Sequence, residues 1–171
     1  MGSAKDNVLF NSFDERSPRY LDPVASYSNP ESAYTFQIYE PLYGYHYLKR
    51  PYELVPTTAQ AVVEPYYADK AGARLPQAAS PEQIAESIYE IKIKPGIKFA
   101  PHPALAVDAQ GRYRYHALTP QQLANKRSPL DFEHQGTREL VAEDYVYGLK
   151  RHATPRIETP IYGIFSEYVI G

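Results

Sequence analysis

Histidine is the residue most often used for metal binding and for acid–base chemistry near neutral pH, and the chain has five. No two of them are spaced as His-Glu-x-x-His, the helical pattern with which two imidazoles reach one metal ion. The spacing therefore indicates no metal site. The five are His46, His102, His116, His134 and His152.

The adjacent carboxylates Glu143 and Asp144 are the nearest approach to an acid–base pair. Neighbouring residues on a helix point about 100° apart, so they seldom share one site. Both fall at the start of a predicted helix, where negative charge complements the helix dipole. The chain also has no cysteine, Gly-x-Ser-x-Gly motif, Walker loop or dinucleotide fingerprint. The sequence indicates no enzyme and no cofactor.

The 17 tyrosines, against no tryptophan, are the most unusual feature of the composition. A phenol ring has an apolar body and a polar end, which suits both ligand contact and packing in a half-buried sheet. The composition leaves both interpretations open.

The bulk properties argue against two classes of partner. A net charge of −2 over 171 residues, without a basic run, does not favour nucleic acid. No apolar window of about 18 residues predicts a membrane span. The start, Met1-Gly2-Ser3, has no basic patch or apolar stretch, so we interpret residues 1–7 as a cloning remnant or a flexible start.

Residues that favour the ends of helices predict two helices and a further short one. Asn29, a capping residue, precedes a proline and Glu31, which predicts a helix start, and Pro41 ends that helix. Residues 142–151 predict the clearest helix, with acidic residues at its start and basic residues at its end. Thr119, followed by proline, predicts a shorter one.

Alternation of apolar with charged residues predicts the strands. Tyr89, Ile91 and Ile93 alternate with charged residues, which predicts the firmest strand of the chain, followed by a turn at Gly96. Residues 108–111 predict the turn of a small hairpin. Short apolar runs at 8–10 and 54–56 predict further extended segments. Strands and helices without an internal repeat predict an α/β fold of the mixed α+β kind.

Four short blocks of sequence are informative because of the order in which they follow one another. The first is Leu-Asp-Pro at 21–23 with Ile-Tyr-Glu-Pro-Leu-Tyr at 38–43, and the second is Leu-Val-Pro at 54–56. The third is the Tyr-Glu-Ile-Lys-Ile-Lys-Pro-Gly-Ile-Lys-Phe run at 89–99, and the fourth is the Ala-Glu-Asp-Tyr-Val-Tyr-Gly-Leu-Lys-Arg run at 142–151. Together they resemble the N-terminal part of family 5 bacterial extracellular solute-binding proteins, the oligopeptide, dipeptide and nickel receptors of ABC transporters.

The resemblance implies a fold and a function. Proteins of that family are several times longer, so residues 1–171 are expected to form a single incomplete domain, part of the first lobe of a periplasmic-binding-protein type II-like fold. The expected function is to capture peptides or a similar small solute in the periplasm, or elsewhere outside the cytoplasm, and to deliver them to a membrane permease. The native signal peptide is expected to be missing from this stretch, which alone should bind solute poorly.

The chain departs from the family pattern in several places. Val141 stands where the family has a capping threonine, and Ala-Pro-His at 100–102 replaces its His-Asp-Gly. The tryptophan that follows the second block in the family is missing. Residues 100–141 are longer than the usual connection, and we interpret them as a family-atypical insertion.

The resemblance also implies ligand contacts. By position they are Tyr27, Ser28 and Asn29 after the first block, and Ile161 and Tyr162 after the fourth. Extended chain there is expected to pair with a peptide backbone. The alternative is that Asn29 only caps its helix and the two rings only pack.

A rival interpretation is a stand-alone tyrosine-rich interaction or carbohydrate-binding module, whose exposed rings stack on a ligand. Such a module would be stable alone, whereas part of a lobe would expose apolar surface and associate. An enzyme comes third, because it would need the histidines and carboxylates to converge in one pocket.

Overall fold

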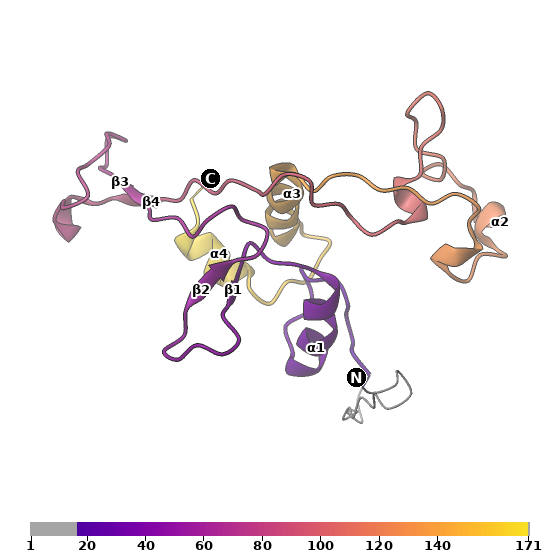
Figure 1. The fold of residues 1–171 in the computed structure, drawn as a ribbon, viewed down its shortest axis with the longest axis horizontal. Helices are drawn as coiled ribbons and strands as arrows, with labels where there is room; N and C mark the ends of the chain where they lie inside the picture. The colour runs from indigo at the N-terminus through magenta and orange to yellow at the C-terminus, as the bar shows by residue number, and fades with distance from the viewer. Residues whose placement is uncertain (1–16, 171) are drawn as a thin grey trace, which may run out of the picture. The chain divides into compact units, whose positions relative to one another are not determined.

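The computed structural model describes residues 17–170 (Figure 1). The start at residues 1–7 and the strand predicted at 8–10 lie outside the described residues. The chain divides into two compact units, and helix α3 contributes residues to both. The first unit comprises residues 1–40 with 146–171, and the second comprises residues 41–145.

The first unit is helical. It contains α1 (Asn29–Ile38), the larger part of α3 (Ala142–His152) and α4 (Tyr162–Tyr168). The predicted helix before Pro41 is confirmed, but its cap is Ser28 and not Asn29. Ser28 has the extended backbone that a capping residue needs, while Asn29 is already helical.

The buried side of α1 is polar. Glu31 is 4% exposed and Thr35 is buried, whereas Tyr34 and Ile38 are exposed. A buried carboxylate must be hydrogen-bonded to be tolerated, so the partners of Glu31 decide how this unit is built.

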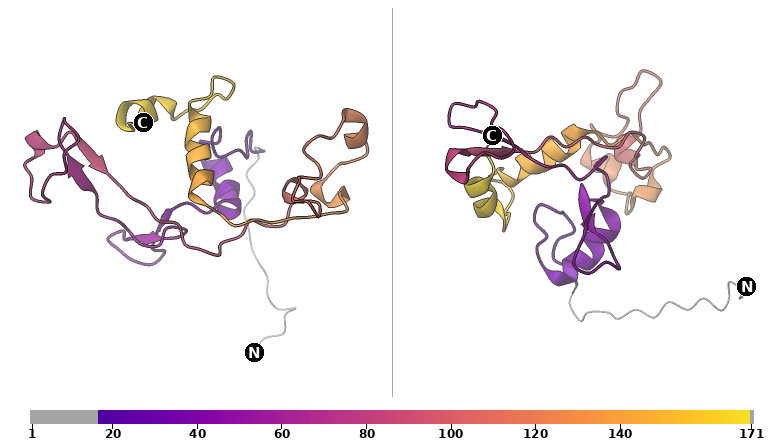
Figure 2. Two further views of the ribbon diagram at one scale, coloured as in Figure 1. Left: turned by 90° about the horizontal axis from the view of Figure 1, so that it is seen from above. Right: turned by 60° about the vertical axis from the view of Figure 1, so that its left-hand side comes forward.

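The second unit contains two separate antiparallel hairpins (Figure 2). In one, β1 (Tyr43–Tyr45) pairs with β2 (Leu54–Pro56). In the other, β3 (Tyr66–Ala68) pairs with β4 (Glu86–Ile88). The extended segment predicted at 54–56 is confirmed as β2.

The strand predicted from Tyr89 to Ile93 is wrong in its position, because β4 ends before Tyr89. Backbone hydrogen bonds join this run to its neighbour at two points only, from Gln60 N–H to the Lys92 carbonyl and from Lys94 N–H to the Thr58 carbonyl, both 2.8 Å. Alternating side chains favour extended chain, but a strand also needs a continuous partner.

Residues 97–140, called the excursion below, leave and return along paired backbone. Leu140 N–H donates to the Ile97 carbonyl at 2.8 Å, and His102 and Gly136 exchange hydrogen bonds of 2.8 and 3.1 Å. The turn predicted at Gly96, which has a φ of +81°, is confirmed. The pairing closes the excursion at its base.

Inside the excursion the elements are short. The hairpin predicted at 108–111 is confirmed by a bridge between Val107 and Tyr113 and by a positive φ at Gly111. The helix predicted after Thr119 is α2 (Pro120–Leu123), with Thr119 as its cap. Two single 3₁₀ turns, η3 (Pro103–Leu105) and η4 (Pro129–Asp131), complete it, and a third, η2 (Pro81–Gln83), precedes β4.

Few apolar side chains are buried in the part of the chain that the structure describes. They are Val24, Ala59, Ala68, Pro103 and Ala106. The combination of helices and small antiparallel sheets agrees with the mixed α+β prediction at that coarse level. Among the described helices, none has the length and apolar character needed to cross a bilayer.

Candidate functional site

All five residues proposed to contact ligand belong to the first unit. Tyr27, Ser28 and Asn29 stand at the N-terminal end of α1, and Ile161 and Tyr162 at the N-terminal end of α4. Within residues 17–170, no hydrogen bond or ring stack joins the first group to the second directly. Their relative placement therefore depends on other residues.

Glu31 organises the first group from inside α1. Its carboxylate accepts hydrogen bonds from four backbone N–H groups, with distances of 3.1 Å from Arg19, Tyr20 and Tyr27 and 3.2 Å from Ser28. Burial raises the pKa of Glu31, but hydrogen bonds from Ser28, Tyr20 and Tyr27 outweigh that effect and lower it. The carboxylate thus stays charged and draws two separate stretches of backbone together.

This arrangement restricts how the first group can meet a ligand. The N–H groups of Tyr27 and Ser28 are engaged by Glu31, and the Ser28 carbonyl accepts from Ser32. The ring of Tyr27 is 66% exposed. Ring contact is therefore better supported here than backbone pairing with a peptide.

An ion pair ties the residues before α1 to the end of α3. The guanidinium of Arg151 donates two hydrogen bonds to the carboxylate of Asp22, one to each oxygen, with Nη1 2.9 Å from Oδ1. Asp22 also accepts from the Val24 N–H at 3.1 Å, and its carbonyl accepts from the Ser26 N–H at 2.8 Å. The hydrogen bond from Arg151 lowers the pKa of Asp22 despite partial burial.

His152, next to Arg151, connects α3 to the second group. Its Nδ1 lies 2.8 Å from Thr159 Oγ1, and its ring stacks on Phe165 of α4 with centroids 5.1 Å apart. Burial lowers the pKa of His152, and the charge of Arg151 lowers it further, while Asp22 partly opposes this. The imidazole is therefore held neutral near pH 7.

Sequence reasoning missed the residues that position the site. Asp22 and Arg151 both fall inside blocks of the family resemblance, which was the available signal. In the sequence, Glu31 marks only a helix start, and His152 is only one of five scattered histidines. Nothing in the sequence alone says that these side chains meet.

The remaining histidines have ordinary partners. His46 accepts from the Leu48 N–H, and His102 accepts from the Ala104 N–H. His116 Nε2 lies 2.8 Å from the Ala104 carbonyl, and His134 Nε2 lies 3.9 Å from a carboxylate oxygen of Glu133. The described residues contain no group of three histidine, cysteine, aspartate or glutamate side chains that could hold a metal ion.

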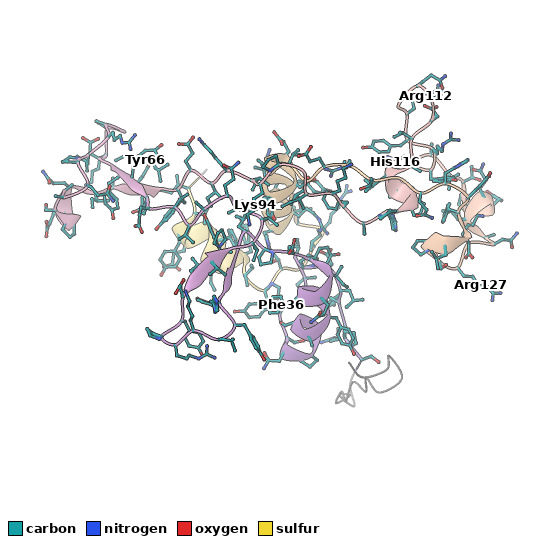
Figure 3. The ribbon with its side chains drawn as sticks, in the orientation of Figure 1. Phe36, Tyr66, Lys94, Arg112, His116 and Arg127 are labelled. Carbon is teal, nitrogen blue, oxygen red and sulfur yellow. The ribbon has the colours of Figure 1, made fainter. Side chains whose placement is uncertain are left out.

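Two open cavities occur in the excursion. The smaller, about 370 Å³, lies beside α2 and includes His116 and Arg127 in its lining. The larger, about 630 Å³, lies at the 108–111 turn and includes Arg112. Figure 3 labels these three lining residues. In the larger cavity, Arg112 is already paired with Asp108. Neither cavity contains a residue of the candidate set.

Comparison with known proteins adds no family. No protein-family model matches the chain, and neither the search of curated proteins nor the search of solved structures found a match.

Proposed function

We propose that this chain is part of the first lobe of a solute-binding protein that captures a peptide or a similar small solute outside the cytoplasm for the permease of an ABC importer. The proposal rests on the family resemblance. The observation that supports it best is that residues from different blocks of that resemblance contact one another.

In the first unit, the contact joins the first and fourth blocks. Asp22 belongs to the first and Arg151 to the fourth, 129 positions later, and they form a two-pronged ion pair. A chance similarity of short sequence runs gives no reason for two of them to meet through complementary charges. A shared fold gives one, because a two-pronged arginine–carboxylate pair can hold two distant segments in a fixed geometry.

In the second unit, one set of contacts joins the third block to the second. Another contact joins the fourth block to Thr58, which lies just after the second block. Lys94 of the third block donates from Nζ to the carbonyls of Pro56 at 3.2 Å and Thr57 at 2.6 Å (Figure 3). Thr58, which is fully buried, shares a hydrogen bond of 2.5 Å with the hydroxyl of Tyr145 in the fourth block. These contacts are the ones expected if the blocks mark one structural framework.

The excursion contains nearly all of residues 100–141, the stretch interpreted as an insertion, and starts in the last three residues of the third block. Its first and last residues are paired through the backbone, so the chain re-emerges beside the point where it left. An insertion of this kind leaves the framework on either side unchanged.

In the proposed mechanism, nothing is chemically transformed. The exposed rings of Tyr27 and Tyr162 provide apolar surface with a polar end, which tolerates varied side chains in a solute. The second lobe known from the family would close over the solute by a hinge motion and present it to the permease. This stretch alone is expected to bind weakly.

Isothermal titration with a defined mixture of tri- and tetrapeptides tests the proposal. We expect micromolar or tighter binding by the longer protein that carries this sequence, and weak or no heat from residues 1–171. Equal binding by both would contradict the proposal, and so would no binding by the longer protein.

A carbohydrate-binding module remains the second candidate, because of the loop between β1 and β2. Tyr45, Tyr47 and Tyr52 are each at least 69% exposed there, and the Arg50 guanidinium lies 4.4 Å from the Tyr52 ring centre. Exposed rings of this kind can stack on sugars. Binding of oligosaccharides by residues 1–171, abolished by Tyr47→Ala, would favour the module over the receptor.

A further inference from the structure

We propose that Arg151 and His152, at the C-terminal end of α3, are positioning residues that fix the two groups of solute contacts relative to each other. The inference rests on the proposed function and names the residues on which its specificity depends. It uses only contacts within the first unit.

Two sets of contacts, called the two arms below, carry the inference. The first arm is the contact of Arg151 with Asp22. Asp22 organises the turn that precedes α1, through its side chain to the Val24 N–H and through its carbonyl to the Ser26 N–H. Tyr27 follows that turn directly, and its N–H is fixed by Glu31. Arg151 therefore anchors one end of a short segment whose other end is anchored by α1.

The second arm is the contact of His152 with the chain on both sides of Ile161. Thr159, which shares a hydrogen bond with the imidazole, precedes Ile161 by two residues. Phe165, on which the imidazole stacks, donates its N–H to the Ile161 carbonyl at 3.1 Å. His152 thus holds the segment that carries Ile161 and Tyr162 before and after those residues.

The two arms start from adjacent residues of one helix. Adjacent residues on a helix point in different directions, so Arg151 and His152 can serve different segments without competing. Because both belong to the last turn of α3, a change in that turn is transmitted to both groups of solute contacts.

The charged groups around His152 are those of Arg151 and Asp22, and both influence its protonation. Its ring stacks on Phe165, and its Nδ1 shares a hydrogen bond with Thr159. Solute binding should therefore respond to Arg151 and His152 although neither needs to touch the solute.

The chain offers a matched control at the other end of α3. Arg138 forms the same two-pronged pair with Asp144, but it holds the residues just before α3, which carry no proposed solute contact. Replacing Arg138 removes the same charge and a comparable two-pronged ion pair, together with the contact of its guanidinium with the Phe99 ring at 4.6 Å. A general loss of stability should therefore appear in both variants, whereas a loss of positioning should appear only when Arg151 is replaced.

The test uses the longer protein, titrated with the same mixture of tri- and tetrapeptides. We expect Arg151→Met to weaken binding on the order of tenfold or more, Arg151→Lys to restore part of that loss, and Arg138→Met to stay within about twofold. Equal losses in Arg151→Met and Arg138→Met would overturn the inference. Absence of binding by the unaltered protein would instead overturn the proposed function itself, so the two failures are distinguishable.

A solute-free readout tests each arm separately. The chain has no tryptophan, so Tyr27→Trp or Tyr162→Trp introduces a single reporter whose fluorescence anisotropy measures local order. Arg151→Met should lower the anisotropy at position 27, and His152→Ala should lower it at position 162. His152→Phe keeps the stacking and should restore part of the effect. Unchanged anisotropy in Arg151→Met and His152→Ala would overturn the inference even if binding were weakened.

Discussion

Carboxylates act over very different sequence distances in the first unit and in the excursion. In the first unit, Asp22 pairs with Arg151 across 129 positions, and Glu31 reaches back 11 and 12 positions. In the excursion, Asp108 and Asp131 bind partners within four positions and only shape their own turns, whereas Glu139 at its base reaches the Gly96 N–H across 43 positions.

The excursion is closed mainly by backbone. His102 pairs with Gly136, and Phe99 N–H donates to the Arg138 carbonyl at 3.0 Å. Its long-range side-chain contacts at the base include the bonds of Glu139 to the Gly96 N–H and of the Thr137 hydroxyl to the Phe99 carbonyl, and the Arg138 guanidinium lies 4.6 Å from the Phe99 ring centre. The first unit therefore depends on charged side chains, and its stability should respond to pH and to the removal of charge. The excursion depends on the close approach of backbone segments, and its stability should respond to added side-chain bulk.

Added bulk at Gly136 is expected to have the largest effect. A Cβ atom there would lie 2.1 Å from the Leu105 carbonyl oxygen and 2.6 Å from the Ala106 nitrogen, so the backbone would have to move. Gly136→Ala should lower the free energy of unfolding by roughly 1–3 kcal/mol. Hydrogen exchange should increase at His102 and remain unchanged at Tyr27.

Gly148→Ala is the control for that variant. Nothing lies within 4 Å of its added Cβ, and alanine is favoured over glycine inside a helix by up to about 1 kcal/mol. It should therefore stabilise α3. If Gly136→Ala were as stable as Gly148→Ala, the close backbone approach at the base of the excursion would be wrong.

Removal of charge from the first unit should have the next largest effect. Arg151→Met leaves Asp22 partly buried without its partner, and we expect a loss of about 1–2 kcal/mol in the free energy of unfolding, measured in urea. Arg138→Met breaks a pair that is local in sequence and removes the contact of the guanidinium with the Phe99 ring, and we expect a smaller loss of about 0.5–1 kcal/mol. A larger loss in Arg138→Met would reverse the proposed distinction between long-range and local carboxylates.

The same distinction explains what the sequence could predict. Helix starts at Thr119 and near Asn29, and the turn at 108–111, depend on residues within a few positions of one another, and all three were predicted correctly or within one residue. The strand at 89–93 was misplaced, because its extent depends on a partner elsewhere in the chain.

The candidate site shows the limit more clearly. The residues proposed to touch solute came from the resemblance, but the side chains that fix them did not. Whether Arg151 meets Asp22, or His152 meets Thr159, depends on how distant segments pack, and residue type and spacing carry no such information. Glu31 could be placed in the first turn of a helix from the sequence, but its contacts with Arg19 and Tyr20 could not be predicted.

Acid should destabilise the first unit before the base of the excursion. The pKa values of Asp22 and Glu31 are lowered from their ordinary values of 3.8 and 4.5. A carboxyl whose pKa is lower in the folded state stabilises the fold fully above its ordinary pKa, and that stabilisation is lost as the pH falls below it. Between pH 5 and about pH 3, hydrogen exchange at Tyr27 and Ser28 should rise relative to exchange at His102. Equal rises at all three amides would show that the two regions do not differ in their dependence on charge.

Protonation of His152 should have the smallest effect on stability, and this effect should begin at a higher pH than that of the carboxylates. Because its pKa is lowered by burial and by Arg151, the unfolded chain takes up a proton at a higher pH than the folded chain does. Stability is therefore complete above the ordinary value of 6.5 and declines as the pH falls below it. In Arg151→Met the lowering by the guanidinium disappears, so the NMR titration of His152 should move to higher pH, whereas Arg138→Met should leave it in place. An unmoved titration in Arg151→Met would mean that the two adjacent side chains are not coupled, and the last turn of α3 would then hold its two segments independently.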